Sequence, residues 1–216
     1  MAVAVGKSVR EGSALKRAAI LTAARKLFLT DGFERTSMDA IAAEATVSKR
    51  TVYDYYGDKR TLLLAVVEQA MQALSSTVDA AIDEHLTTVE DLHTSLVGFA
   101  TAITSSALGS ADYSAFMRLL TTESTHLPEL RDNQWEIAEP EDAVAARFVE
   151  FDKLGLLRAP RPRVAADHFV ALTLSPSYYS LGHKVDITDA ATARFIVDGV
   201  DAFLRAYGPG DEDRSR

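Results

Sequence analysis

Apolar residues recur at intervals of three and four along almost the whole chain, and no segment shows sustained alternation of apolar and polar residues. This is the spacing of helices that bury one face, so the sequence predicts an all-α protein. A first helix is expected from Ala14 to Thr30, and Asp31 and Gly32 are expected to end it. Two short helices and one long helix should follow, with expected ranges of 36–44, 48–55 and 58–84.

Polar residues mark where the next helices begin. Thr36 precedes Asp39 by three residues, which resembles a capping box and predicts that Thr36 caps the second helix. Ser48 is expected to cap the third helix, and Asp58 is expected to cap the long one. The rest of the chain predicts further helices at 90–105, 111–122, 141–154, 164–181 and 188–207.

The two short helices and the tight break between them follow the helix-turn-helix plan, in which the last helix enters the major groove of DNA. Helical spacing turns Met38, Ile41, Val47, Val52 and Tyr56 toward a core. The positions left on the outside of the last helix are hydroxylic, basic or aromatic, and such side chains meet base edges, thymine methyl groups and phosphates. They are Ser48, Lys49, Arg50, Thr51, Tyr53 and Tyr55.

The distribution of charge along the chain matters more for DNA binding than the net charge does. The chain has a formal net charge of −8, which taken alone argues against nucleic acid. Residues 1–60, however, hold eleven Lys and Arg against seven Asp and Glu, and the remainder holds twelve basic and twenty-four acidic residues. A basic head on an acidic body suits a protein that touches phosphates with its head alone, with chance asymmetry between two surfaces as the alternative.

The composition also bears on the compartment. The chain has no cysteine, which removes disulfides and thiolate metal sites. It has no uncharged apolar run of the roughly 18 residues that a membrane span needs, and no signal-peptide core at its start. We therefore expect a cytoplasmic protein.

Residues 32–42 and 45–59 resemble the DNA-binding domain of the TetR family of transcriptional regulators, with many positions in agreement at fixed spacing. The resemblance implies an all-α homodimer that binds a palindromic operator on double-stranded DNA and is usually released by a small-molecule effector. The candidate DNA contacts are Thr36, Ser37, Ser48, Lys49, Arg50, Thr51, Tyr53, Tyr55 and Lys59.

Two positions depart from the family's pattern. Thr46 stands in the turn where the family usually has glycine. If that position needs a positive φ, a β-branched threonine is costly there, so we expect either local strain or a different turn. Tyr56 replaces a more usual phenylalanine and adds a hydroxyl that needs a partner or solvent.

The body carries a weaker resemblance. Residues 116–123, 126–130 and 155–158 are similar to the C-terminal domain of the AefR-like subgroup, which implies a fold more than a ligand. An effector pocket would be mostly apolar with a few polar anchors, although packing in the core is the commoner role of such side chains. The pocket candidates are His93, Phe99, Met117, His126, Trp135, Phe148, Tyr178 and Tyr179.

The last expected helix carries an apolar stripe that is broad enough for burial against two neighbours. Pairing the last two helices of each chain would give a four-helix dimer interface, and an internal core helix is the alternative. The stripe consists of Phe195, Ile196, Gly199, Val200, Phe203 and Leu204.

These inferences divide the chain into a flexible basic arm at 1–13, a helix-turn-helix DNA-binding domain at 14–60, a helical effector-binding and dimerisation domain at 61–207 and a disordered tail at 208–216. We expect a sequence-specific transcriptional regulator, a repressor released by its effector, with no enzyme activity, cofactor or metal site. One alternative is a constitutive DNA-binding protein without an effector. Another is an enzyme with a DNA-binding head, although the sequence shows no converging catalytic groups.

Overall fold

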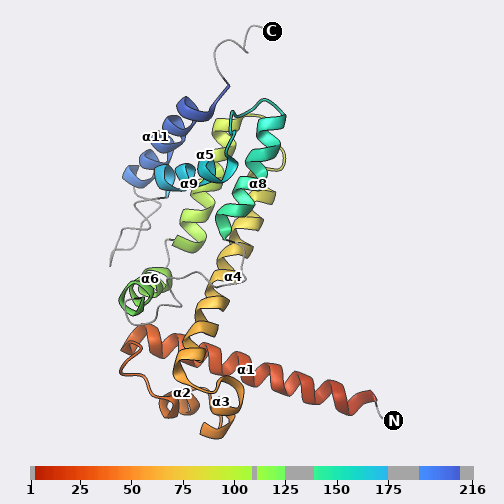
Figure 1. The fold of residues 1–216 in the computed structure, drawn as a ribbon, viewed down its shortest axis with the longest axis vertical. Helices are drawn as coiled ribbons and strands as arrows, with labels where there is room; N and C mark the ends of the chain where they lie inside the picture. The colour runs from red at the N-terminus through yellow and green to blue at the C-terminus, as the bar shows by residue number, and fades with distance from the viewer. Residues whose placement is uncertain (1–2, 109–110, 125–138, 175–189, 210–216) are drawn as a thin grey trace. The chain divides into compact units, whose positions relative to one another are not determined.

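The computed structural model describes residues 3–108, 111–124, 139–174 and 190–209. All regular structure in these residues is helical, which confirms the all-α prediction (Figure 1). The elements are α1 (Val3–Asp31), α2 (Met38–Glu44), α3 (Lys49–Tyr56), α4 (Lys59–His85), α5 (Leu92–Ile103), the π-helical turn η1 (Thr104–Leu108), α6 (Ala111–Glu123), α8 (Pro140–Lys153), α9 (Pro162–Thr173) and α11 (Ala190–Tyr207).

The described residues form two compact units. The first unit, called the head below, contains α1, α2, α3, the start of α4 through Met71, and α6 from Phe116 onward. The second unit, called the body, begins at Gln72 and contains the rest of α4 together with α5, α8, α9 and α11. Each unit has its own hydrophobic core.

The head core is built from one face of each of its helices. From α1 it takes Ile20, Ala24 and Phe28, which recur every fourth residue and are almost completely buried. From α2 and α3 it takes Ile41 and Val52, both fully buried. The core is completed by residues of α4 and α6, including Leu62, Leu63, Val66, Phe116 and Leu119.

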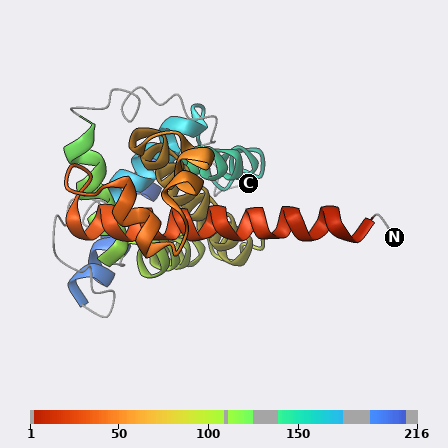
Figure 2. The same ribbon diagram turned by 90° about the horizontal axis from the view of Figure 1, so that it is seen from below.

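The first helix begins earlier than the sequence pattern predicted. We expected a flexible arm at 1–13, whereas the structure places residues 3–13 in the first turns of α1 (Figure 2). Gly12 was interpreted as part of a non-helical segment. A single glycine lowers helix stability by only about 1 kcal/mol relative to alanine, however, and the alanine, lysine and arginine around it favour a helix. The continuous helix is therefore physically reasonable.

The body core centres on three phenylalanines that join three helices. Phe148 of α8, Phe169 of α9 and Phe203 of α11 are all fully buried. The ring of Phe169 meets those of Phe148 and Phe203 edge to face, with centroids 5.9 and 5.2 Å away. Edge-to-face contacts of this kind add roughly 0.5–1.5 kcal/mol per pair beyond the burial of area. They fix α8, α9 and α11 against one another.

The apolar stripe of α11 serves this core, which corrects the dimer prediction. Ile196, Gly199, Val200 and Phe203 are buried within their own chain. A Cβ atom at Gly199 would lie 2.2 Å from the carbonyl oxygen of Leu172, so α11 approaches the backbone of α9 too closely for any side chain. These four residues are therefore unavailable to a partner.

The two remaining members of the predicted stripe differ from each other. Leu204 packs partly buried against the body core, so it also serves its own chain. Phe195 is 37% exposed and is the stripe residue that faces outward.

Helix α4 reaches both cores. Among the described residues, it is the one helix whose length and apolar composition would allow it to cross a membrane. Its apolar side chains have another use here, because Leu62, Leu63 and Val66 lie in the head core and Val78 and Ala81 lie in the body core. The start and end of α4 confirm the prediction of a long helix at 58–84.

The turn between α2 and α3 shows which backbone conformation Thr46 adopts, a question that the sequence left open. Thr46 has a φ of +56° and is the one non-glycine residue with positive φ in the described part of the chain. Its N–H donates to the carbonyl of Ala43, and the N–H of Val47 donates to that of Ala42. The turn thus keeps the left-handed conformation at position 46, and the β-branched side chain carries the strain of that conformation.

Replacing Thr46 with glycine should therefore stabilise the protein. Removing the Cβ relieves about 1–2 kcal/mol of left-handed strain, and the added freedom of the unfolded chain offsets about 0.5–1 kcal/mol of it. We expect a rise of about 0.5–1 kcal/mol in the free energy of unfolding, measured by urea denaturation. Thr46→Ala keeps the Cβ and should give a smaller rise. A loss of stability in Thr46→Gly would show that the side chain is favourable there.

Candidate nucleic-acid interface

Serine residues cap both short helices of the head. The Ser37 Oγ accepts a hydrogen bond from the N–H of Ala40 at 3.1 Å, and the Ser48 Oγ accepts one from the N–H of Thr51 at 3.1 Å. The cap predicted for Ser48 is confirmed. The cap predicted for Thr36 is wrong by one residue, because Ser37 occupies that position.

Thr36 has a structural role instead. Its side chain is 3% exposed, and its hydroxyl donates to the carbonyls of Gly32 at 2.8 Å and Leu27 at 3.2 Å. These bonds satisfy carbonyl groups at the C-terminal end of α1, which lack partners within the helix. Because the side chain points into the protein, Thr36 does not belong to the exposed surface that a DNA contact requires.

Helix α3 has one buried face and one exposed face. Val52 and Tyr56 turn inward and are 0% and 9% exposed. Lys49 and Arg50 lie in the exposed turn after the cap, and the Arg50 side chain is 90% exposed. Tyr53 is 43% exposed, an unusual value for an aromatic side chain that could have joined the core. The structure therefore brings these three predicted contacts together on one surface.

Acidic residues hold the two basic side chains of this surface. The Lys49 ammonium lies 2.7 Å from an Asp39 carboxylate oxygen, which joins α3 to α2. The hydrogen bond to Asp39 raises the pKa of Lys49 above its ordinary value. The Arg50 Nε lies 3.7 Å from Asp54, one turn along α3. Neither Asp39 nor Asp54 was among the functional residues predicted from the sequence.

The two tyrosines at the end of α3 connect it to α1. The Tyr55 hydroxyl and the Ser13 Oγ share a hydrogen bond of 2.8 Å, and the Arg17 guanidinium lies 5.6 Å from the centre of the Tyr55 ring. The Tyr56 hydroxyl donates to the carbonyl of Arg17 at 3.4 Å, which gives this hydroxyl the partner that its burial requires. Burial also raises the pKa of Tyr56.

The N-terminus of α4 is fastened by its first two polar residues. The Asp58 carboxylate accepts a hydrogen bond from the N–H of Thr61 at 2.7 Å, which lowers the pKa of Asp58 and confirms it as the expected cap. The Lys59 ammonium donates to the carbonyls of Phe33 at 2.8 Å and Glu34 at 3.3 Å. Two of the three N–H groups of Lys59 are therefore engaged within the protein, and its ammonium also lies 4.4 Å from the centre of the Phe33 ring.

A small apolar cavity lies in the body. Its volume is about 20 Å³, close to that of a single water-sized sphere. Apolar pairs with a spacing of four residues line it from α4, α5 and α9, and Pro140, Glu141 and Val144 of α8 complete the lining. The helical pairs are Leu74 and Val78, Phe99 and Ile103, and Val170 and Leu174.

Of the predicted pocket residues, Phe99 lines this cavity. Phe148 lies in the aromatic core, and His93 sits at the body surface with its Nε2 3.2 Å from an Asp201 oxygen of α11. Met117 is a partly exposed residue of α6 in the head unit. The other four candidates lie outside the described residues and are His126, Trp135, Tyr178 and Tyr179.

Within the described ranges, no group of three or more His, Asp and Glu side chains is arranged to hold a metal ion. The buried polar side chains that are described are few and scattered, and they include Thr104, Glu123 and Thr173. The hydroxyls of Thr104 and Thr173 donate to the carbonyls of Ala100 in α5 and Phe169 in α9.

Two family models match the chain. Residues 20–66 match the model for bacterial regulatory proteins of the tetR family. Residues 94–209 match the model for the C-terminal domain of AefR-like transcriptional repressors, which covers more than half of the chain. The first match spans the head from α1 to the start of α4, and the second covers most of the body.

Individual proteins agree with these models. The chain is 31% identical over 77 residues to the regulator YhgD of Bacillus subtilis (strain 168), a match that covers 36% of this chain and 40% of YhgD. A TetR-family regulator of Mesorhizobium loti is similar in structure, with a TM-score of 0.81 at 25% identity over 91% of this chain and 98% of that one. The flavonoid-responsive regulator FrrA has a TM-score of 0.66 at 28% identity, over 90% and 97% of the two chains.

The matched segment thus spans well under half of the curated relative, whereas the structural similarity extends over nearly the full length of both solved chains. The structural similarity covers 91% and 90% of this chain. Together with the two family models, these similarities show that the chain belongs to the TetR family of helix-turn-helix transcriptional regulators and carries an AefR-like C-terminal domain.

Proposed function

We propose that this regulator is a homodimeric repressor that binds a palindromic operator through α3 and leaves it when a small molecule binds the body. The observation that carries the DNA-binding part is the exposed surface of α3, where Lys49, Arg50 and Tyr53 gather on a helix whose other face is buried. A helix of this kind can enter the major groove while the core holds it from behind.

The side chains on this surface suit different parts of DNA. Arg50 has an exposed guanidinium, the group that most often reads guanine in the major groove. Lys49 and Tyr53 suit phosphates, and the Thr51 methyl group suits the methyl group of thymine. The Thr51 hydroxyl is 2.7 Å from the Ser48 Oγ, so these two residues are oriented by each other before DNA arrives. Ser37, Tyr55 and Lys59 would contribute at the edges of the interface.

The dimer interface is proposed for the partly exposed flank of α11 that carries Phe195, since the inward face belongs to the body core. Phe195 is 37% exposed, which is unusual for a large apolar side chain unless another surface covers it. A symmetric dimer presents two recognition helices about 34–36 Å apart, one turn of DNA, and this spacing matches a palindromic operator.

The effector site is proposed for the cavity lined by Phe99 and the neighbouring apolar pairs. At about 20 Å³ it is far smaller than the roughly 300–1,000 Å³ of a typical ligand site, so binding requires the lining helices to separate. Helix α4 contributes Leu74 and Val78 to this lining and Leu62 and Leu63 to the head core. Movement of α4 would therefore alter how the head is held, provided that the ligand prefers the moved conformation.

The nearly filled body also favours a second candidate, a DNA-binding protein that needs no effector. The name of the structural relative FrrA points the other way, because that protein is described as flavonoid-responsive. We infer from these features a cytoplasmic regulator without enzyme activity, whose partners are DNA, a second copy of the chain and an apolar effector.

Arg50→Ala and Thr51→Ala should each weaken binding to the preferred duplex, identified by selection from a random DNA pool. Loss of a base contact lowers discrimination by about 1–3 kcal/mol, so we expect roughly a 5- to 150-fold loss of affinity in a gel-shift titration. The matched control is Arg158→Ala, an exposed arginine of the body, which should bind as the wild type does. Unchanged binding by both α3 variants would remove this helix from DNA readout.

Phe195→Asp should convert the dimer to a monomer, because a charge would have to be buried in the proposed α11 interface. Sedimentation velocity is expected to show the monomer at concentrations where the wild type is a dimer, with a parallel loss of operator affinity. Leu154→Asp is the control, since Leu154 is 69% exposed at the end of α8 and outside that face. Equal sedimentation of Phe195→Asp and wild type would place the interface elsewhere.

A flavonoid such as naringenin serves as a probe of the effector site. We expect it to lower operator affinity by a factor between about 5 and 150, the usual range of coupling between two sites. Val170→Phe would fill the cavity and should retain operator binding while losing this response. A panel of flavonoids and other planar aromatics that changes neither operator affinity nor thermal stability would instead support the regulator without an effector.

A further inference from the structure

A groove lies between α1 and α4 within the head. It has a volume of about 360 Å³, and its lining consists of Ser13, Ala14, Arg17, Ala18 and Leu21 of α1 together with Gln69 of α4. This volume falls within the range of roughly 300–1,000 Å³ that is usual for small-molecule sites. Unlike the body cavity, the groove is therefore large enough for a ligand without any separation of its walls.

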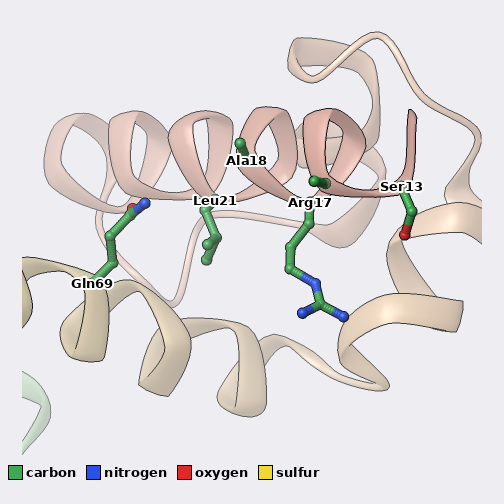
Figure 3. A pocket seen from close by; sticks show the side chains of 6 residues that line it. Ser13, Arg17, Ala18, Leu21 and Gln69 are labelled. Atoms are coloured by element: carbon green, nitrogen blue, oxygen red, sulfur yellow. The ribbon is translucent and has the colours of Figure 1, made fainter. Parts of the chain in front are cut away.

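The groove combines an apolar strip with polar groups. Ala14, Ala18 and Leu21 follow one another at intervals of four and three along α1, so they lie on one face of the helix. The close view shows the Arg17 side chain entering the space between the helices and the Gln69 side chain reaching toward α1 (Figure 3). An apolar lining with a few polar groups that converge on it is the usual composition of a ligand site.

The Arg17 guanidinium is held in place without being neutralised. It lies over the Tyr55 ring, 5.6 Å from the ring centre, within the range of a cation–π contact. The Tyr55 hydroxyl is in turn held by its hydrogen bond of 2.8 Å with the Ser13 Oγ. In the part of the chain that the structure describes, no acidic side chain pairs with Arg17. Because a ring contact uses the face of the guanidinium, the N–H groups in its plane remain available to an anion.

A carboxylate with an apolar body fits this arrangement better than a simple anion does. The two oxygens of a carboxylate match the two parallel N–H groups that a guanidinium presents. Inorganic phosphate would satisfy the charge of Arg17 but would leave the apolar strip exposed to water. A ligand that has both parts also gains from covering Ala14, Ala18 and Leu21.

We propose that the groove between α1 and α4 binds a small apolar carboxylate, with Arg17 as its anchor and the strip on α1 as the surface for its apolar body. This site is separate from the proposed effector cavity, whose lining belongs to the body. Tyr55, which supports Arg17, lies in the last turn of α3. The groove therefore brings a small molecule directly to the head, whereas a ligand in the body cavity must act through α4.

The test is an NMR titration of the full chain, without DNA, with 2-naphthoate as the probe. For a ligand of this size we expect a dissociation constant of about 1 mM or lower. Naphthalene-2-methanol has the same apolar body without the charge, and inorganic phosphate has charge without the apolar body. Each of these two should bind at least about 5-fold more weakly than naphthoate. Equal affinity for naphthoate and either of the other probes would overturn the proposal.

Variants locate the bound probe. Arg17→Gln should weaken naphthoate binding by roughly 5- to 20-fold, a modest factor for a charge-assisted hydrogen bond because the groove is open to solvent. Lys16→Gln is the matched control, since it removes the same charge from an exposed neighbour that does not line the groove. Ala18→Phe keeps the charge and should also weaken binding, because its ring would fill the groove.

The opposite results are equally clear. Naphthoate binding that is unchanged in Arg17→Gln and Ala18→Phe, or that is lost in Val170→Phe instead, would place the probe elsewhere and overturn the proposal. Arg17 and Ala18 are exposed residues outside the head core, so their replacement should leave thermal unfolding unchanged. Arg50→Ala should bind naphthoate as the wild type does. Failure of the proposed DNA-binding function would therefore leave this titration unaltered and can be told apart from failure of the ligand site.

Discussion

The burial of one face of α3 is the constraint on which the rest of the head depends. The helix has eight residues, too few to persist alone in water. It exists because Val52 and Tyr56 enter the head core and because Ser48 caps its first turn. Those same contacts leave the opposite face outside the core, so its side chains are accessible for recognition. In the proposed function, the core therefore decides which side of α3 faces DNA, and the exposed side chains decide which sequence it prefers.

The helix-turn-helix could be predicted closely because its signals are local. The serine cap at position 48 and the aspartate cap at position 58 each act within one turn of chain, and the structure confirms both. The contacts that span the sequence were not predictable in this way. The hydrogen bond between Ser13 and Tyr55 joins residues that are 42 positions apart in the sequence, and the residue spacing in neither segment predicts it. The same is true of the buried position of Thr36, whose partners lie in α1.

The body shows what periodicity leaves undetermined. A stripe of apolar residues says that one face of a helix is covered, but it does not say what covers it. The apolar face of α11 packs against α9 of the same chain. The two backbones approach so closely at Gly199 that no side chain would fit there. The cavity presents a similar case. Its lining comes from pairs spaced four residues apart on three helices, so it could be found only once the helices were arranged. Of the aromatic candidates that the structure describes, Phe99 lines the cavity and Phe148 lies in the aromatic core.

If Lys49 contacts phosphates as proposed, its ion pair with Asp39 affects how the protein searches a genome. A lysine that already faces a carboxylate must give up that partner to touch a phosphate, so each encounter with DNA gains less from it than from an unpaired lysine. The cost of breaking the ion pair applies at every position along the duplex. Favourable base contacts offset this cost only at the few positions that carry the target sequence. Non-target sites outnumber target sites by about a million or more, so weaker adhesion to them shortens the time spent at wrong positions. The acidic residue beside the recognition helix thus acts against indiscriminate binding as the protein moves along DNA.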